Sequence, residues 1–117
     1  HNHNPQGMPA RDALAACLAT WPDAIRPKVH FSSPRTEMVT VEQRDPEPGR
    51  KQQTLQPPRW TNHSDYIHPF EFIGFLRAAA GLRDFDVMLE AKAKDLALLR
   101  LRQDVARYAP DLAGRVA

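Results

Sequence analysis

The sequence predicts an α/β fold that is incomplete as a single chain of 117 residues. Two observations lead to this prediction: segments with helical periodicity alternate with short β-type segments, and only two strands are predicted along the chain. Strands that alternate with helices usually pair in parallel. A parallel pair leaves both faces and both edges open, so it needs several neighbouring strands. We therefore expect this chain to form the end of a larger α/β domain.

The first helix is predicted at residues 9–21 and the first strand at 27–32. Apolar residues of the helix recur at intervals of three and four, which makes one stripe that faces the core. The members of this stripe are Leu14, Cys17, Leu18 and Trp21. Cys17 is therefore expected to be buried. In the strand, successive side chains point to opposite sides, so Lys28 and His30 share one face.

A long loop is predicted at residues 34–67, because this segment has no helical periodicity. It is rich in proline and carries charges of both signs. Its prolines are Pro34, Pro46, Pro48, Pro57 and Pro58. A loop of this length in a compact domain is usually functional or disordered. The composition of residues 40–60 favours a mobile or inserted segment over a loop that contacts substrate.

The second unit is predicted as a helix at 69–80, a strand at 85–91 and a final helix at 92–108. In the helix at 69–80, the apolar residues on one face are Phe72, Leu76 and Ala79. Strand alternation places Phe85, Val87 and Leu89 on one side and Asp86, Met88 and Glu90 on the other. The stripe of the final helix is Leu98, Leu101, Val105 and Tyr108. Lys92 and Lys94 follow Glu90, and Lys92 is assigned to the solvated face of this helix in preference to a site.

Composition excludes several classes of protein. The 16 basic and 14 acidic residues give a net charge of +2, which is too balanced to indicate nucleic-acid binding by itself. No apolar run approaches the roughly 18 residues of a membrane span, and nothing resembles a signal peptide. The single cysteine fits a cytoplasmic protein. Nucleotide-binding glycine motifs and the GxSxG nucleophile motif do not occur.

Four polar residues are candidates for chemistry: Lys28, His30, His63 and Glu90. The loops that follow strands carry the catalytic groups of many α/β folds. Each residue also has a structural reading, such as a packed histidine, a carboxylate that stabilises the start of the next helix, or a lysine that reaches solvent. Taken together, imidazole and carboxylate groups at neighbouring strand ends indicate a divalent metal such as Mn²⁺, Zn²⁺ or Fe.

Three segments carry a resemblance to a known family: RPKVHFSSPR, HSDYIHPFEF and DFDVMLEAKAKDLALLRLR. They resemble the C-terminal part of the UV damage endonucleases. Members of that family are (β/α)₈ TIM barrels that nick DNA 5′ to UV photoproducts and use a cluster of divalent metals, with manganese commonly implicated. The resemblance implies that this chain supplies the last two strand–helix units of such a barrel. It covers nearly the whole chain except the segment near 40–60.

The resemblance also implies roles for individual residues. His30 and Glu90 would be metal ligands, Lys28 a lysine open to carboxylation, and His63 a group near the metals and the scissile phosphate. By its spacing to Asn4-Pro5, His1 would match the second histidine of a family motif, and the main ligand of that motif would lie upstream of His1. With an insertion or deletion, His1 or His3 would instead be the ligand. Arg35 and Tyr66 would contact DNA. The substrate would be damaged double-stranded DNA, with no membrane involved.

Two alternatives stay open at this point. One is a metal-dependent sugar isomerase or epimerase on the same type of barrel, which would share the histidine and glutamate ligands. The other is a truncated α/β fragment without catalytic activity. The family's other metal-binding strands are missing from this chain, so the remainder of the barrel is needed to complete the site. We expect the parent protein to be a monomeric cytoplasmic enzyme and the isolated fragment to be inactive.

Overall fold

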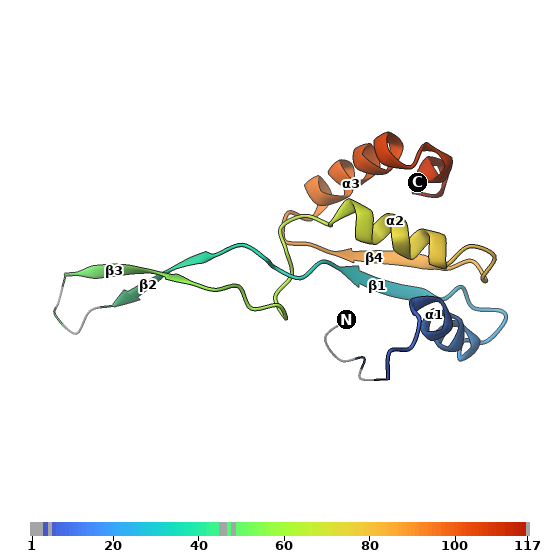
Figure 1. The fold of residues 1–117 in the computed structure, drawn as a ribbon, viewed down its shortest axis with the longest axis horizontal. Coiled ribbons are helices and arrows are strands. Elements are labelled where there is room, and N and C mark those ends of the chain that lie inside the picture. The colour runs from blue at the N-terminus through green and yellow to red at the C-terminus, as the bar shows by residue number, and fades with distance from the viewer. Residues whose placement is uncertain (1–3, 5, 45–46, 48, 117) are drawn as a thin grey trace.

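The computed structural model describes residues 4, 6–44, 47 and 49–116. A body of helices and a parallel sheet carries a long β-hairpin that extends away from it (Figure 1). The elements in chain order are α1 (Ala10–Ala19), β1 (Lys28–Ser32), β2 (Val39–Arg44), β3 (Lys51–Gln56), α2 (Pro69–Ala78), β4 (Asp86–Glu90), α3 (Asp95–Tyr108) and the short 3₁₀ helix η1 (Pro110–Arg115). Among the described residues, no helix reaches the length and apolar character that a bilayer span requires.

Strands β1 and β4 form a two-stranded parallel sheet, as the alternation of strands and helices predicts. Their register pairs Lys28 with Asp86 and Ser32 with Glu90. Both strands therefore end at the same level, and the loops that follow them leave from the same edge of the sheet. This shared edge brings residues 60 positions apart in sequence into contact.

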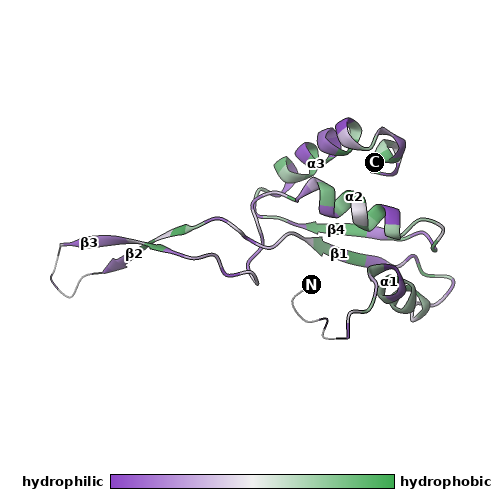
Figure 2. Ribbon diagram, viewed as in Figure 1, coloured by the Kyte–Doolittle hydropathy of each residue, from purple (hydrophilic) through white to green (hydrophobic). Residues whose placement is uncertain are grey.

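One face of this sheet packs against the helices. Phe31 of β1 meets Phe72 of α2 edge to face, with ring centroids 5.1 Å apart. Val87 and Leu89 of β4 pack against the same core cluster. The buried members of that cluster are Ile67, Phe72, Ile73, Leu76, Leu101, Val105, Ala109 and Leu112. Figure 2 shows the hydrophobic residues gathered along β4 and α2, whereas the outer end of the hairpin is hydrophilic.

The opposite face of the sheet is exposed. It carries Lys28 and His30 from β1 and Asp86 and Met88 from β4, and Met88 is 43% exposed. No element in the described part of the chain covers this face. A sheet with one packed and one bare face is consistent with a fragment of a longer α/β protein.

The loop predicted at 34–67 is wrong in its central part, because residues Val39–Arg44 and Lys51–Gln56 pair as an antiparallel hairpin. Their register runs from Val39 opposite Gln56 to Arg44 opposite Lys51. The prolines of this segment that the structure describes, Pro34, Pro57 and Pro58, lie outside the two strands, so they remove no ladder hydrogen bond. Most hairpin side chains are exposed, which is why the strands leave only a faint hydrophobic period.

The predicted apolar stripes need three corrections. Cys17 is exposed, because α1 packs only through Leu14 and Leu18. Trp21 lies beyond the end of α1 and is 36% exposed. In α3 the buried side chains are Ala97, Leu101 and Val105, while Leu98 and Tyr108 are 39% and 46% exposed. The stripe of α3 is thus rotated by one residue toward Ala97. The face predicted for α2 is buried as expected.

Candidate functional site

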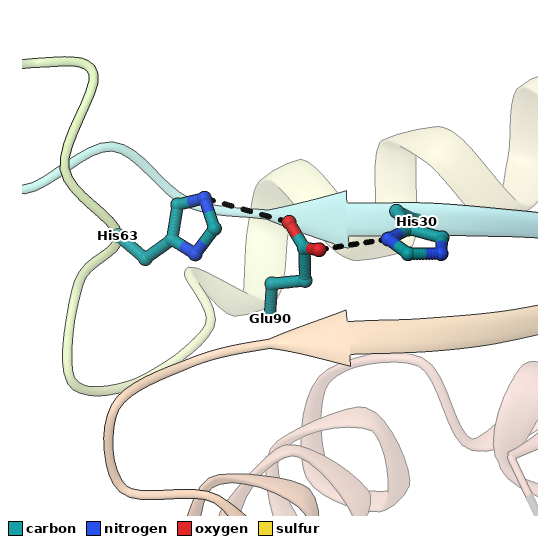
Figure 3. Close-up of polar contacts among 3 residues, drawn as sticks. All are labelled: His30, His63 and Glu90. Atoms are coloured by element: carbon teal, nitrogen blue, oxygen red, sulfur yellow. Dashed lines mark hydrogen bonds and ion pairs between the residues drawn. The ribbon is translucent and has the colours of Figure 1, made fainter.

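Two histidines meet one carboxylate at the carboxyl ends of β1 and β4 (Figure 3). Nδ1 of His30 lies 2.7 Å from Oε1 of Glu90. Nε2 of His63 lies 3.4 Å from Oε2 of the same side chain. Glu90 therefore contacts one imidazole with each of its oxygens. Of the four residues predicted to carry chemistry, the structure brings these three together.

The strands position two members of this group. His30 stands opposite Met88 in the register, and Glu90 follows two residues later on the same face of β4. The pair lies on the uncovered face, where the His30 and Glu90 side chains are 55% and 35% exposed. Burial therefore does not hold these groups in place. The register of the strands and the contact with each other do so.

His63 is positioned by backbone pairing with the end of β1. An isolated antiparallel bridge joins Pro34 to His63. On either side of it, Arg35 N–H donates to the Asn62 carbonyl at 2.8 Å, and Ser64 N–H donates to the Ser33 carbonyl at 2.9 Å. The chain therefore leaves the body at Arg35 and returns to it at Asn62, and these contacts fix His63 next to the end of β1.

The loop after β4 is tied to the same segment. Lys92 N–H donates to the Ser64 carbonyl at 3.1 Å, and Ala93 N–H donates to the Asp65 carbonyl at 3.0 Å. Three loops therefore meet at the carboxyl edge of the sheet and hold one another through their backbones. Such cross-links satisfy backbone groups that would otherwise need water. They also keep the site from depending on a single flexible loop.

Ser33 is a further structural element of this edge. It is 3% exposed, and its hydroxyl oxygen accepts a hydrogen bond from His68 N–H at 2.8 Å. His68 precedes the first turn of α2, where backbone N–H groups lack helical partners. Ser33 therefore links the end of β1 to the start of α2. The sequence gives no nucleophile setting for this serine, and its contacts are those of a structural residue.

The other predicted site residues are distributed around this group. Lys28 is exposed on the face of His30 and forms no ion pair or side-chain hydrogen bond within the described residues. The Arg35 side chain is 16% exposed; its Nη2 lies 2.6 Å from Asp65 Oδ1, while its Nε is buried without a hydrogen-bond partner among the described residues. Tyr66 is 46% exposed. His1 and His3 lie outside the residues that the structure describes.

A hollow of about 510 Å³ adjoins Glu90 and His63. Its walls come from the segment before His63 and from the loop after β4. The lining residues are Thr61, Asn62, His63, Leu89, Glu90, Ala91, Lys92 and Lys94. Lys92 was assigned to a solvated helix face; it is exposed, but together with Lys94 it lies in the turn before α3 and borders this hollow. The predicted helix start at 92 is too early, because α3 begins at Asp95.

A model of the UV-endonuclease UvdE family matches residues 1–112. The chain belongs to the UvdE family. Among its curated relatives, a UV DNA damage endonuclease of Halalkalibacterium halodurans is 37% identical over 94 residues, which are 78% of this chain and 23% of the relative. Another of Bacillus cereus is 35% identical over 111 residues, 91% of this chain and 28% of the relative. The chain thus spans about a quarter of these relatives. No solved structure matches it.

The side chains of His30, His63 and Glu90 offer the kinds of donor atom that metal sites use. Imidazole nitrogens and carboxylate oxygens are ligands for Mn²⁺, Zn²⁺ and Fe²⁺, so the residue types fit a divalent ion. Among the described residues, however, no three His, Cys, Asp or Glu side chains are arranged to hold one. Nδ1 of His30 and Nε2 of His63 each point at a Glu90 oxygen and not at a shared centre. The described residues supply part of a ligand set and do not complete it.

Proposed function

We propose that this chain is part of a DNA repair endonuclease that nicks damaged double-stranded DNA 5′ to UV photoproducts by metal-assisted hydrolysis. The observation that carries the proposal is the contact of His30 and His63 with the two oxygens of Glu90, in a chain that belongs to the UvdE family. Strand register and loop pairing place these groups at the carboxyl edge of the sheet, where barrel enzymes carry their active sites.

His30 and Glu90 would hold a divalent metal, with Mn²⁺ expected and Zn²⁺ the alternative. A bound metal would lower the pKa of a coordinated water and neutralise charge that develops on the phosphate. His63, on the loop side of Glu90, would face the scissile phosphate. It is held by the backbone bridge to Pro34, which limits its freedom before substrate arrives.

Lys28 is the least ordinary member of this proposal. It lies on the same exposed face as His30, two residues earlier, which is roughly 6.6 Å along an ideal strand. Carboxylation of its amine would replace a cation with an anion that suits a metal cluster. Its exposure and its lack of an ion pair within the described residues leave the amine accessible for that modification.

One face of the β1–β4 sheet is uncovered within the described residues, which supports the proposal that further barrel strands complete the site. Those strands would bring the missing ligands and the rest of the DNA-binding surface. We therefore propose that the 117-residue chain alone is inactive. Tyr66 is exposed and suits a DNA contact, whereas Arg35 would first have to leave Asp65. We further propose that the complete enzyme is a cytoplasmic monomer.

The test is a nicking assay with Mn²⁺ on UV-irradiated and unirradiated plasmid. The protein is a hybrid in which this chain replaces the matching segment of the Bacillus cereus relative. We expect nicks in the irradiated plasmid only, and loss of nicking in the Glu90→Gln hybrid. A folded hybrid, checked by circular dichroism, that leaves irradiated DNA intact would contradict the proposal. Isomerisation of a sugar by the same hybrid would favour the alternative barrel function.

A further inference from the structure

The hollow beside Glu90 is bordered by two lysines whose charge nothing in the described part of the chain compensates. Neither Lys92 nor Lys94 forms an ion pair or a side-chain hydrogen bond there. Lys51 on the hairpin, by comparison, lies 3.4 Å from Glu42. The carboxylate in the wall of the hollow is Glu90, and both of its oxygens already contact histidines. The hollow therefore carries excess positive charge.

The remaining walls of the hollow suit an anion with several oxygens. Thr61 and Asn62 are exposed and contribute a hydroxyl and an amide, both of which can donate hydrogen bonds. Lysine ammonium groups bind phosphate as compact point charges with three rotatable donors. A volume of about 510 Å³ lies within the range of roughly 300–1,000 Å³ that is usual for ligand pockets.

The backbone conformation of Lys94 is a second, independent observation. Lys94 has φ of 52° and is the one non-glycine residue with positive φ among those described. Its ψ is −120°, a combination that strongly favours glycine. Such a conformation costs of order 1–3 kcal/mol for a residue with a side chain. The protein is less stable with lysine at position 94 than it would be with glycine. A ligand that binds the lysine side chain would explain why this position is not glycine.

We propose that this hollow binds a phosphate group, with Lys92 and Lys94 as its charged contacts and Thr61 and Asn62 as hydrogen-bond donors. The hollow shares Glu90 and His63 with the candidate site. A DNA strand whose scissile phosphate lay at that site would therefore place a neighbouring phosphate in the hollow. The backbone of DNA as the source of the phosphate rests on the proposed function. Affinity for the phosphate group itself does not.

An NMR titration of the 117-residue chain tests the site with two probes, inorganic phosphate and the dinucleotide TpT. We expect saturating shifts of the Lys92, Lys94 and Asn62 signals with both probes. Loss of one charge-assisted contact weakens binding by roughly tenfold, so Lys92→Gln and Lys94→Gln should each raise the apparent Kd by about that factor. Lys51→Gln, on the hairpin, should leave it unchanged.

Lys94→Gly separates binding from structure. It removes the side chain and relieves the backbone, so we expect a higher Tm together with weaker phosphate binding. A dispersed spectrum without shifts at about 50 mM phosphate, or shifts that survive both glutamine substitutions, would overturn the site. Binding of inorganic phosphate without binding of TpT would overturn DNA as its source.

The hybrid enzyme provides a second measurement if the isolated chain gives no dispersed spectrum. In the hybrid, Lys92→Gln and Lys94→Gln should raise KM for irradiated plasmid several-fold and leave kcat near its original value. Unchanged KM in both variants would overturn the phosphate site while the nuclease proposal stands. Phosphate binding in a folded hybrid that does not nick would leave this site intact and contradict the proposed function.

Discussion

His30 Nδ1 lies 2.7 Å from Glu90 Oε1, although 60 residues separate the two in sequence. The parallel register of β1 and β4 brings them together, and the contact lies on a face that no described element covers. Ion pairs this exposed contribute about 0–1 kcal/mol to stability. The pair is therefore poorly explained as a stabilising device and well explained as part of a site.

Glu90→Gln should abolish nicking by the hybrid while changing the free energy of unfolding by no more than about 1 kcal/mol. The amide keeps the shape of the side chain but loses the charge that a metal and two imidazoles require. Urea unfolding and the nicking assay on the same preparations measure the two effects. Glu37→Gln, at an exposed position outside the strands, is the matched control. Equal nicking by the Glu90→Gln hybrid would remove this carboxylate from the site.

His30→Ala should lower metal content and nicking together, because the proposed metal site would lose a ligand. Elemental analysis of the purified hybrid gives the metal stoichiometry, and the plasmid assay gives the activity. His68→Ala serves as the control, since His68 is exposed and takes part in the fold through its backbone N–H. A His30→Ala hybrid with full metal content would exclude His30 as a ligand.

The isolated chain should not nick UV-irradiated plasmid with Mn²⁺, because the described residues do not complete a metal site. Purified chain and hybrid are compared at equal concentration. Nicking by the chain alone that disappears in its Glu90→Gln variant would show that these 117 residues suffice.

Arg83 should contribute strongly to stability through its contacts with the segment between α1 and β1. Its guanidinium donates to the carbonyls of Trp21, Pro22, Asp23 and Ile25. Hydrogen bonds from a charged donor are worth about 1.5–3 kcal/mol, so Arg83→Ala should lower the free energy of unfolding by at least that amount. Arg102→Ala, at an exposed position of α3, should change it by less than about 0.5 kcal/mol. Equal effects of the two substitutions in urea unfolding would contradict this.

The hairpin should be dispensable for the fold of the body. Arg35 and Asn62 are joined by a 2.8 Å backbone hydrogen bond, so the chain leaves and returns at one point. Replacing residues 37–60 with a short glycine-containing turn should leave the amide signals of β1 and β4 in place. Shorter loops close at lower entropic cost, by about 0.6 kcal/mol per halving of length. Loss of the Ser64–Ser33 pairing in this variant would show that the hairpin holds His63.

Local patterns in the sequence predicted the parts of the fold that depend on short-range periodicity. Strand alternation placed Lys28 and His30 on one face and Glu90 on the matching face of β4, and the parallel pairing made these faces coincide. The buried face of α2 followed from helical spacing in the same way. These features need only the identity of neighbours within one element.

Features that depend on long-range pairing were missed. The hairpin has mostly polar strands that pair with each other, and its only short apolar alternation, Val39 and Val41 in β2, is too brief to reveal a strand. The stripe of α3 was misplaced because Leu98 is as apolar as Leu101, and only the packing of Leu101 and Val105 into the core with α2 decides which face of α3 is buried. Lys92 was assigned to a helix face because nothing local marks the late start of α3. The contacts of Ser33 and Arg83 likewise require tertiary neighbours.

Within the described residues, the two-stranded sheet also has two edges that pair with no further strand, one on β1 and one on β4. Each edge presents unpaired backbone N–H and C=O groups, which recruit further strands. Closure into a barrel would use both edges and leave none. In the isolated chain the same groups can pair with other copies of the chain. A high concentration of the chain therefore favours pairing between copies. Co-expression at low concentration with the further barrel strands that we propose is therefore expected to give each edge a strand to pair with.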